Sequence, residues 1–320
     1  MNNAAVLFHK KATPGVRICT FLFAVLTFFL ILNGCNANQE KHFPAPPSDV
    51  SSLKGQEGST SILSDSVYKY ETQEFYAQRD ENQIYGIIYI PQDTGHKMPA
   101  VIFSHGFGGT YSAGAQYAEA LAQKGYVVYC FDFCGGSPVS RSDGSTLEMS
   151  IFTEQEDLEA VISKVQALDY VDNNNLFLLG TSQGGVVSAI TGAAHPDKIR
   201  GMILLYPAFI LVDDANKLFQ SEDEIPDTYY FLWMNVGRAY FEPLLGYDIY
   251  ADIAAYNKEV LLIHGDTDSI VPLSYSERAL EVYFKSELKV IPGGGHGFYG
   301  EDAQQTISYI LEYLEAHQVS

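Results

Sequence analysis

Residues 176–184 read Leu-Phe-Leu-Leu-Gly-Thr-Ser-Gln-Gly, an apolar run that leads through a serine into a helical stretch. A short, continuously apolar run of this kind is typical of a strand buried on both faces of a parallel sheet. Glycines two positions before and after Ser182 allow a tight turn from strand to helix, where larger side chains would clash. Such a turn projects the serine hydroxyl outward and points the free amides of the helix N-terminus toward it. The stretch therefore predicts an accessible serine at the end of a buried strand.

Strand and helix patterns alternate along the rest of the chain. Residues 67–75 and 83–90 alternate apolar and polar side chains, which predicts an antiparallel pair at a sheet edge. Continuous apolar runs predict buried strands at residues 100–104, 127–131, 176–180, 202–206, 260–263 and 288–291. Helical patterns lie between them, at residues 116–124, 152–168, 183–194, 274–282 and 303–316. The alternation predicts an α/β fold in which helices flank a mostly parallel, twisted sheet.

An insertion interrupts this alternation between the sixth and seventh predicted strands, at about residues 208–257. It is much longer than an ordinary connection and is rich in aromatic residues. Because ligands bind at the carboxyl edge of a parallel sheet, we expect the insertion to form a cap over the site. Tyr229, Tyr230 and Trp233 are then candidate substrate contacts. The alternative is that the aromatic residues form only the small core of the insertion itself.

A serine hydroxyl is a poor nucleophile at neutral pH and needs a positioned base. Among eight histidines, His296 lies in the glycine-rich stretch 292–298, just after the last predicted strand. A loop of this kind lets an imidazole reach over the sheet edge, so His296 is the predicted base. His105 and His264 each precede a glycine at a strand end, where we expect them to support a turn.

The base needs a carboxylate that fixes its tautomer and stabilises its charged form. Residues 264–272, His-Gly-Asp-Thr-Asp-Ser-Ile-Val-Pro, follow a predicted strand and offer two candidates. Asp268 lies further along the loop and is the predicted partner of His296, whereas Asp266 is expected to make a turn-stabilising hydrogen bond. The resulting order of serine, aspartate and histidine is one of the known orders for this triad.

A tetrahedral intermediate also needs hydrogen-bond donors for its negative oxygen. Residues 105–109, His-Gly-Phe-Gly-Gly, follow the strand at 100–104, and the glycines allow backbone amides to turn toward the site. The predicted donors are the amides of Phe107 and of Gln183, the residue after the serine. The alternative is an ordinary glycine-rich turn.

In combination these motifs resemble the α/β-hydrolase superfamily over about residues 67–316. A narrower likeness to bacterial cinnamoyl (feruloyl) esterases rests on residues 105–109, 180–188 and 204–208 and on the insertion. That resemblance implies Ser182, Asp268 and His296 as the catalytic residues and the amides of Phe107 and Gln183 as the oxyanion donors. It also implies that the cap forms a pocket for a phenolic acyl group.

One loop departs from the pattern of these relatives, which usually carry a shorter turn ending in Ser-Asp-Gly. Here Asp-Phe-Cys-Gly-Gly-Ser-Pro occupies residues 132–138, and Ser-Asp-Gly arrives only at 142–144. A longer loop can reshape the substrate pocket. Cys130 reads as a small buried hydrophobe at a strand end, and a disulfide between Cys130 and Cys134 stays open as an alternative.

Composition excludes several other classes of protein. The net charge of −20 argues against a nucleic-acid partner, since phosphates are held by clustered Lys and Arg. An apolar content of 47% is too high for a disordered chain. Four cysteines cannot form a disulfide scaffold in 320 residues, and no Cys/His spacing resembles a zinc site. We therefore expect neither a metal nor an organic cofactor.

The N-terminal part has the character of a targeting segment. Residues 1–34 carry three basic residues, no acidic residue and an apolar run from Ile18 to Leu32, as in a signal peptide. Residues 32–35, Leu-Asn-Gly-Cys, resemble the lipobox of bacterial lipoproteins, which implies lipidation of Cys35. Residues 35–66 are predicted to be a flexible tether to the domain at 67–320. The expected location is the cell envelope, outside the cytoplasm and lipid-anchored to a membrane; a plain secretory signal or an uncleaved anchor is the alternative.

These features predict a serine carboxylesterase that needs no cofactor and takes a small-molecule or polysaccharide-linked ester, with hydroxycinnamate esters as the expected substrates. Two other functions stay open. A prolyl-oligopeptidase-type peptidase uses the same triad order, although residues 36–66 cannot supply the large N-terminal domain usual in those enzymes. The third candidate is a non-catalytic envelope binding protein, which would need none of the triad geometry.

Overall fold

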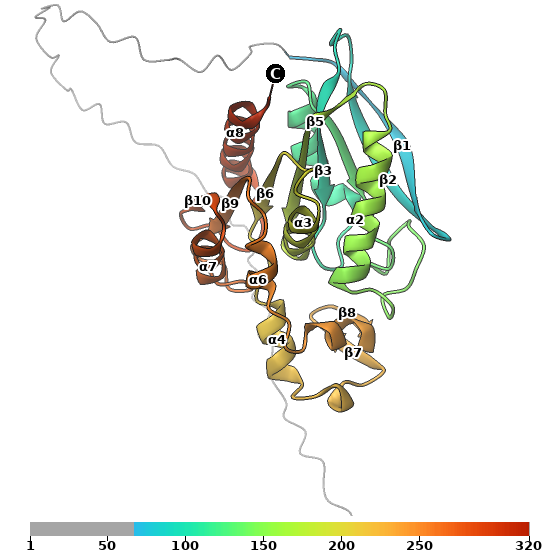
Figure 1. The fold of residues 1–320 in the computed structure, drawn as a ribbon, viewed down its shortest axis with the longest axis vertical. Coiled ribbons are helices and arrows are strands. Elements are labelled where there is room, and N and C mark those ends of the chain that lie inside the picture. Colours follow the sequence, from blue (N-terminus) through green and yellow to red (C-terminus); the bar gives the residue numbers. More distant parts are fainter. Residues whose placement is uncertain (1–66, 320) are drawn as a thin grey trace, which may run out of the picture. The chain divides into compact units, whose positions relative to one another are not determined.

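The computed structural model describes residues 67–319, which contain an eight-stranded sheet in the order β1-β2-β4-β3-β5-β6-β9-β10 (Figure 1). Its strands are β1 Tyr70–Arg79, β2 Asn82–Pro91, β3 Met98–Ser104, β4 Val127–Phe131, β5 Val171–Thr181, β6 Gly201–Leu205, β9 Glu259–Gly265 and β10 Lys285–Ile291. β1 and β2 pair antiparallel with each other, and β2 pairs antiparallel with β4. The pairings from β4 through β3, β5, β6 and β9 to β10 are all parallel. The predicted mostly parallel sheet with an antiparallel edge pair is confirmed.

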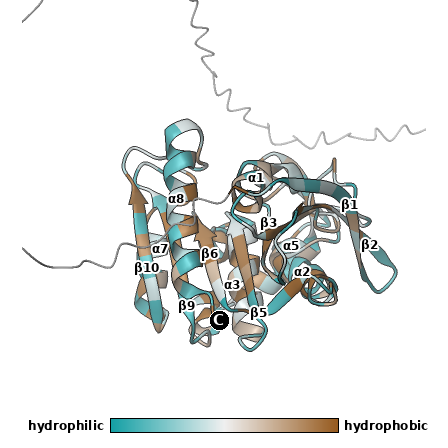
Figure 2. Ribbon diagram, turned by 90° about the horizontal axis from the view of Figure 1, so that it is seen from above, coloured by the Kyte–Doolittle hydropathy of each residue, from teal (hydrophilic) through white to brown (hydrophobic). Residues whose placement is uncertain are grey.

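Helices cover both faces of the sheet. On one face lie α2 Ile151–Gln166, α3 Gln183–Ala194 and α7 Ser274–Val282, and on the other lie α1 Ala115–Ala122 and α8 Gly300–His317. Successive side chains of a strand point to opposite faces, so Ile102 packs in the cluster with α2 and α3 while Val101 and Phe103 pack with α1 and α8. Figure 2 shows this pattern as hydrophobic strands between the two helix layers. Burial on both faces is why these strands read as continuous apolar runs.

The connection from β6 to β9 contains the insertion predicted at about 208–257. Its elements are α4 Leu211–Leu218, the 3-10 turn Glu222–Glu224, β7 Thr228–Phe231, β8 Met234–Gly237, α5 Arg238–Phe241, the 3-10 turn Glu242–Leu244 and α6 Ile249–Ile253. β7 and β8 form an antiparallel hairpin, which lies with α4 beyond one end of the sheet (Figure 1). Rings of Phe219, Tyr229 and Phe241 pack edge to face with centroids 5.1–5.5 Å apart. Part of the aromatic content therefore forms a small core within the insertion.

Within residues 67–319, no helix combines the length and apolar character needed to cross a membrane. The predicted signal peptide (1–34), the tether (35–66) and Cys35 lie outside the described residues.

Candidate active site

Ser182 lies on the predicted tight turn, between the end of β5 and the start of α3. Its φ of 51° is in the left-handed region, which residues other than glycine rarely adopt. The turn is possible because its neighbours are small. A Cβ on Gly180 would collide with the carbonyl of Gly184, and a Cβ on Gly184 would collide with the carbonyls of Ser104 and His105. The two glycines thus let the backbone of β3, β5 and α3 meet directly beneath the serine.

Gly184→Ala is expected to lower thermal stability by several degrees or to prevent folding, because overpacking against rigid backbone costs about 1–3 kcal/mol or more. Gly192→Ala, in the same helix, is the matched control. Its added methyl group meets the flexible side chain of Met202 rather than backbone, and alanine favours the helix. Thermal unfolding followed by circular dichroism measures both. Equal stability of the two variants would contradict the crowding of this turn.

The structure brings Ser182, His296 and Asp268 into one hydrogen-bonded chain. Ser182 Oγ lies 2.9 Å from His296 Nε2, and His296 Nδ1 lies 2.7 Å from Asp268 Oδ2. Since a carboxylate only accepts, Nδ1 carries the hydrogen and Nε2 of the neutral ring accepts from the serine hydroxyl. This is the tautomer that a general base requires.

Asp268 is held as a carboxylate by four donors. Its Oδ1 accepts from the backbone amides of Ile270 and Val271, each at 2.9 Å. Its Oδ2 accepts from His296 and also lies 3.2 Å from Nε2 of His264. Burial by itself would raise the pKa of Asp268, but the hydrogen bonds from the two histidines and the Val271 amide outweigh it and hold that pKa well below its usual range. Asp268 is therefore negatively charged and fixed in orientation.

His264 is fully buried beneath this carboxylate. Its Nε2 faces two acceptors, the carbonyl of Val271 at 2.8 Å and Asp268, so that nitrogen carries the hydrogen. Its Nδ1 then accepts from the hydroxyl of Ser276 at 2.7 Å. The expectation that His264 supports a turn is confirmed. The sequence analysis missed its contact with Asp268, for which the spacing of four residues was the available signal.

Contacts between two loops place His296. Thr267, in the loop after β9, donates its amide to the carbonyl of Gly294 at 3.0 Å. The amide of Gly293 donates to Asp266 Oδ1 at 2.7 Å, which confirms the turn-stabilising role expected of Asp266. The ring of Tyr206, at the end of β6, packs edge to face on the imidazole with centroids 4.8 Å apart. Hydrogen bonds thus join the loop of Asp268 to the loop of His296, and the imidazole of His296 packs against the ring of Tyr206.

The loop at 105–109 lies directly against the serine. A Cβ on Gly106 would come within 3.1 Å of Ser182 Cβ. Two other amides of this loop already have acceptors: Gly108 donates to the carbonyl of Gly136, and Gly109 donates to the carbonyl of Gly106. Among the described residues, no group accepts from the amide of Phe107 or of Gln183, so both are available to a bound oxygen. His105 supports the turn as expected, with Nδ1 donating to the carbonyl of Gly106 at 2.8 Å.

The three candidate substrate contacts lie in different surroundings. The Tyr229 ring packs on Phe219 and Phe241 in the core of the insertion. The Tyr230 side chain is 65% exposed. Of the three, Trp233 alone lies at the loop 105–109, with its ring centroid 5.5 Å from that of Phe107. Of the three candidates, Trp233 is therefore the one that contacts the loop beside Ser182.

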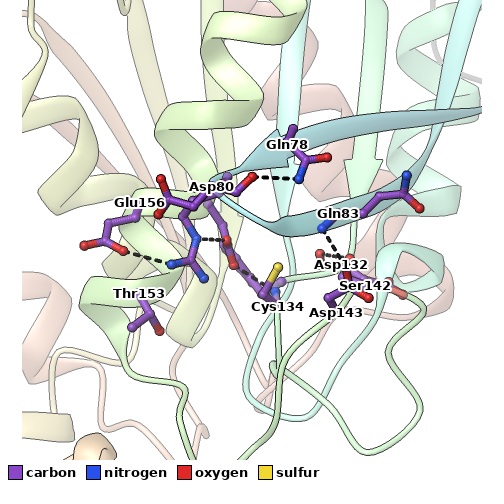
Figure 3. Close-up of polar contacts among 12 residues, drawn as sticks. Gln78, Asp80, Gln83, Asp132, Cys134, Ser142, Asp143, Thr153 and Glu156 are labelled. Carbon is purple, nitrogen blue, oxygen red and sulfur yellow. Dashed lines mark hydrogen bonds and ion pairs between the residues drawn. The ribbon is translucent and has the colours of Figure 1, made fainter.

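The long loop after β4 is hydrogen-bonded to β2, to α2 and to the loop 105–109. Asp143 accepts from the amide of Gln83 at 2.8 Å, and the amide of Cys134 donates to Asp157 (Figure 3). The hydroxyl of Ser137 donates to the carbonyl of Gly108 at 3.1 Å. Cys130 and Cys134 are both buried and have free thiols, so the structure does not contain a disulfide between them.

Known proteins are similar to this chain in sequence. A family model described as serine aminopeptidase, S33, matches residues 95–233. An uncharacterized protein of Escherichia coli O157:H7 is 27% identical over 255 residues, which cover 76% of this chain and 81% of that protein. A Bacillus subtilis protein named as a member of the AB hydrolase superfamily is 23% identical over 266 residues, covering 69% of this chain and 93% of its own.

A solved structure is similar over most of the described residues. It is Est1E from Butyrivibrio proteoclasticus with ferulic acid bound, at a TM-score of 0.70 and 25% identity, covering 76% of this chain and 98% of that one. The fold is that of the α/β-hydrolases, and these likenesses relate the chain to the α/β-hydrolase superfamily. Within that superfamily, the same likenesses support assignment of the protein as a serine hydrolase.

Proposed function

We propose that the protein is a serine carboxylesterase with Ser182 as nucleophile, His296 as general acid and base, and Asp268 as the orienting carboxylate. The observation that carries the proposal is the continuous hydrogen-bonded chain from Ser182 Oγ to Asp268 Oδ2, beside the amides of Phe107 and Gln183, which have no acceptor within residues 67–319. A binding protein needs none of these features. Apart from the ester and water, every group in the proposed steps belongs to the chain itself.

The reaction proceeds in two halves. Ser182 Oγ attacks the ester carbonyl as its proton passes to His296 Nε2, and the carbonyl oxygen, now negative, accepts from the amides of Phe107 and Gln183. The bond to the alcohol breaks, the alcohol takes the proton from Nε2, and the acyl group stays on Oγ. Water then attacks this acyl-enzyme, giving its proton to His296, and the acid leaves as Ser182 regains its hydrogen.

Hydroxycinnamate esters are the substrates we propose. The likeness to Est1E, whose structure holds ferulic acid, supports this choice, as do the rings of Phe107 and Trp233 beside the oxyanion loop. We expect methyl ferulate to be hydrolysed with a kcat/KM at least comparable to those of p-nitrophenyl acetate and butyrate. A preference for the short aliphatic esters by orders of magnitude would contradict the hydroxycinnamate assignment but not the proposed esterase activity.

A serine peptidase is the second candidate, favoured by the description of the matching family model as serine aminopeptidase. Both functions use the same triad, so the substrate panel must include aminoacyl-proline amides and aminoacyl p-nitroanilides. Amide cleavage at rates equal to or above those of the esters would favour the peptidase. A fluorophosphonate probe that fails to label the native protein would contradict both enzymes.

A further inference from the structure

The side chain of Gln183 is enclosed and hydrogen-bonded at both ends. Its Nε2 donates to Glu154 Oε2 at 2.8 Å, and its Oε1 accepts from the hydroxyl of Tyr240 at 2.7 Å. All three residues are 1% exposed. They come from three elements: Glu154 from α2, Gln183 from the first turn of α3, and Tyr240 from α5 of the insertion. The proposed catalytic steps use none of these side-chain groups.

Tyr240 also contacts the second proposed oxyanion residue. Its ring packs on that of Phe107 with centroids 5.5 Å apart and an interplanar angle of 65°. Phe231, at the end of β7, packs on the same phenylalanine at 5.6 Å. One residue of the insertion therefore touches the side chains of both residues whose amides face the site.

The peptide that carries the amide of Gln183 is held through the carbonyl oxygen of Ser182, which accepts from the amides of Gly185 and Ala208 at 3.0 Å and of Val186 at 3.3 Å. A helix N-terminus is often fixed by a capping side chain, but Ser182, at the capping position of α3, makes no such hydrogen bond. Ser182 itself has a left-handed φ, a strained conformation that persists only when surrounding contacts maintain it. The anchored side chain of Gln183 begins at the Cα next to this amide and adds a restraint on the other side of the peptide.

The state of Glu154 suits this anchoring. Burial raises the pKa of Glu154 to about 8, and the hydrogen bond from Gln183 and the nearby charge of Asp157 are smaller influences. At neutral pH the carboxyl group is therefore mostly uncharged. It can accept from Gln183 without placing an unpaired charge in the core, which would be costly.

We propose that Tyr240 and Glu154 are positioning residues for the oxyanion site, acting through the Gln183 side chain and, for Tyr240, also through the Phe107 ring. The inference rests on the proposed function. Donors aimed in advance at the developing negative charge act without reorganisation, so misalignment lowers the rate of the chemical step more than it weakens substrate binding. The insertion then contributes to catalysis from outside the triad.

Tyr240→Phe tests the inference, measured with p-nitrophenyl acetate. Its ring packing is kept and only the hydroxyl is lost, so we expect kcat to fall about 10-fold with KM changed less than about twofold. Tyr256→Phe is the matched control, because that fully buried tyrosine loses a hydrogen bond to the carbonyl of Ile199, outside the site. A kcat for Tyr240→Phe equal to that of the control, or a change in KM alone, would overturn the inference.

A cycle of variants shows whether both residues act through Gln183. Glu154→Leu is expected to lower kcat as Tyr240→Phe does, and Glu154→Gln, which keeps an acceptor, to recover most of the loss. Gln183→Leu removes both hydrogen bonds, and because it leaves the buried Glu154 carboxyl and Tyr240 hydroxyl without this partner, thermal unfolding is measured beside kcat to show that the variant is folded. In that background Tyr240→Phe should cause no further loss beyond about twofold, and full additivity would contradict the shared route.

Failure of this inference and failure of the proposed function give different results. Native protein that neither hydrolyses esters nor reacts with a fluorophosphonate would remove the proposed function itself. Native protein that does both, with an unaffected Tyr240→Phe variant, would remove only the positioning role.

Discussion

Ser182→Ala is expected to lower kcat for ester hydrolysis by about 10^5- to 10^6-fold, the loss seen when the nucleophile of such a triad is removed. Its hydroxyl oxygen lies 2.9 Å from His296 Nε2, within hydrogen-bond distance of the proposed base. Alanine retains the Cβ and the backbone geometry at this position, so the fold should persist. Rates with p-nitrophenyl acetate and labelling by a fluorophosphonate probe measure the change, and labelling should disappear.

Ser188→Ala is the control for this variant. Ser188 lies in the same helix, and its buried hydroxyl has no hydrogen-bond partner among the described residues. Its removal should leave kcat within about twofold of the native value, since no paired group is lost. If Ser182→Ala keeps more than about one per cent of the native rate, the nucleophile lies elsewhere and the proposed mechanism is wrong.

Local sequence patterns predict most of the fold because the residues at the ends of many helices and strands mark where these elements begin and end. α3 has the predicted bounds, Gln183–Ala194, since a turn precedes it and His195 and Pro196 follow it. β5 begins at Val171, five residues before the predicted start. Residues 172–174 are polar and lie outside the apolar run, but Val171 pairs with Met98 before a register shift in the ladder. That extension is determined by tertiary pairing, which the local pattern does not contain.

The same distinction applies to the site. Ser182, Asp268 and His296 each follow a strand of the parallel sheet, so their convergence at one edge can be predicted from strand order. Glu154 could not be found this way, because a glutamate in an amphipathic helix is usually exposed. Tyr240 is one of many aromatic residues in an insertion without a clear period. Which aromatic ring reaches the site depends on packing between the insertion and the loop after β3.

Asp268→Asn is expected to lower kcat by about 10^3- to 10^4-fold while preserving the shape of the site. All four hydrogen bonds to this side chain are donated to it: two backbone amides to Oδ1 and two imidazoles to Oδ2. An asparagine must present its NH2 group to one of these pairs. Turned toward the histidines, it favours the His296 tautomer with hydrogen on Nε2, which cannot accept the serine proton. Turned the other way, its NH2 group faces the backbone N–H groups of Ile270 and Val271, so that donors face donors.

Asp266→Asn is the matched control for Asp268→Asn, because Asp266 lies two residues away on the same loop. Asp266 accepts a hydrogen bond from the amide of Gly293 through Oδ1, and an asparagine oxygen can accept it equally well. We expect its kcat to stay within about threefold of the native value, as measured with p-nitrophenyl acetate at pH 7.5. A large loss in Asp266→Asn with little loss in Asp268→Asn would reverse the roles of the two carboxylates. The number of donors facing each one, four against one, is the physical reason to expect the opposite.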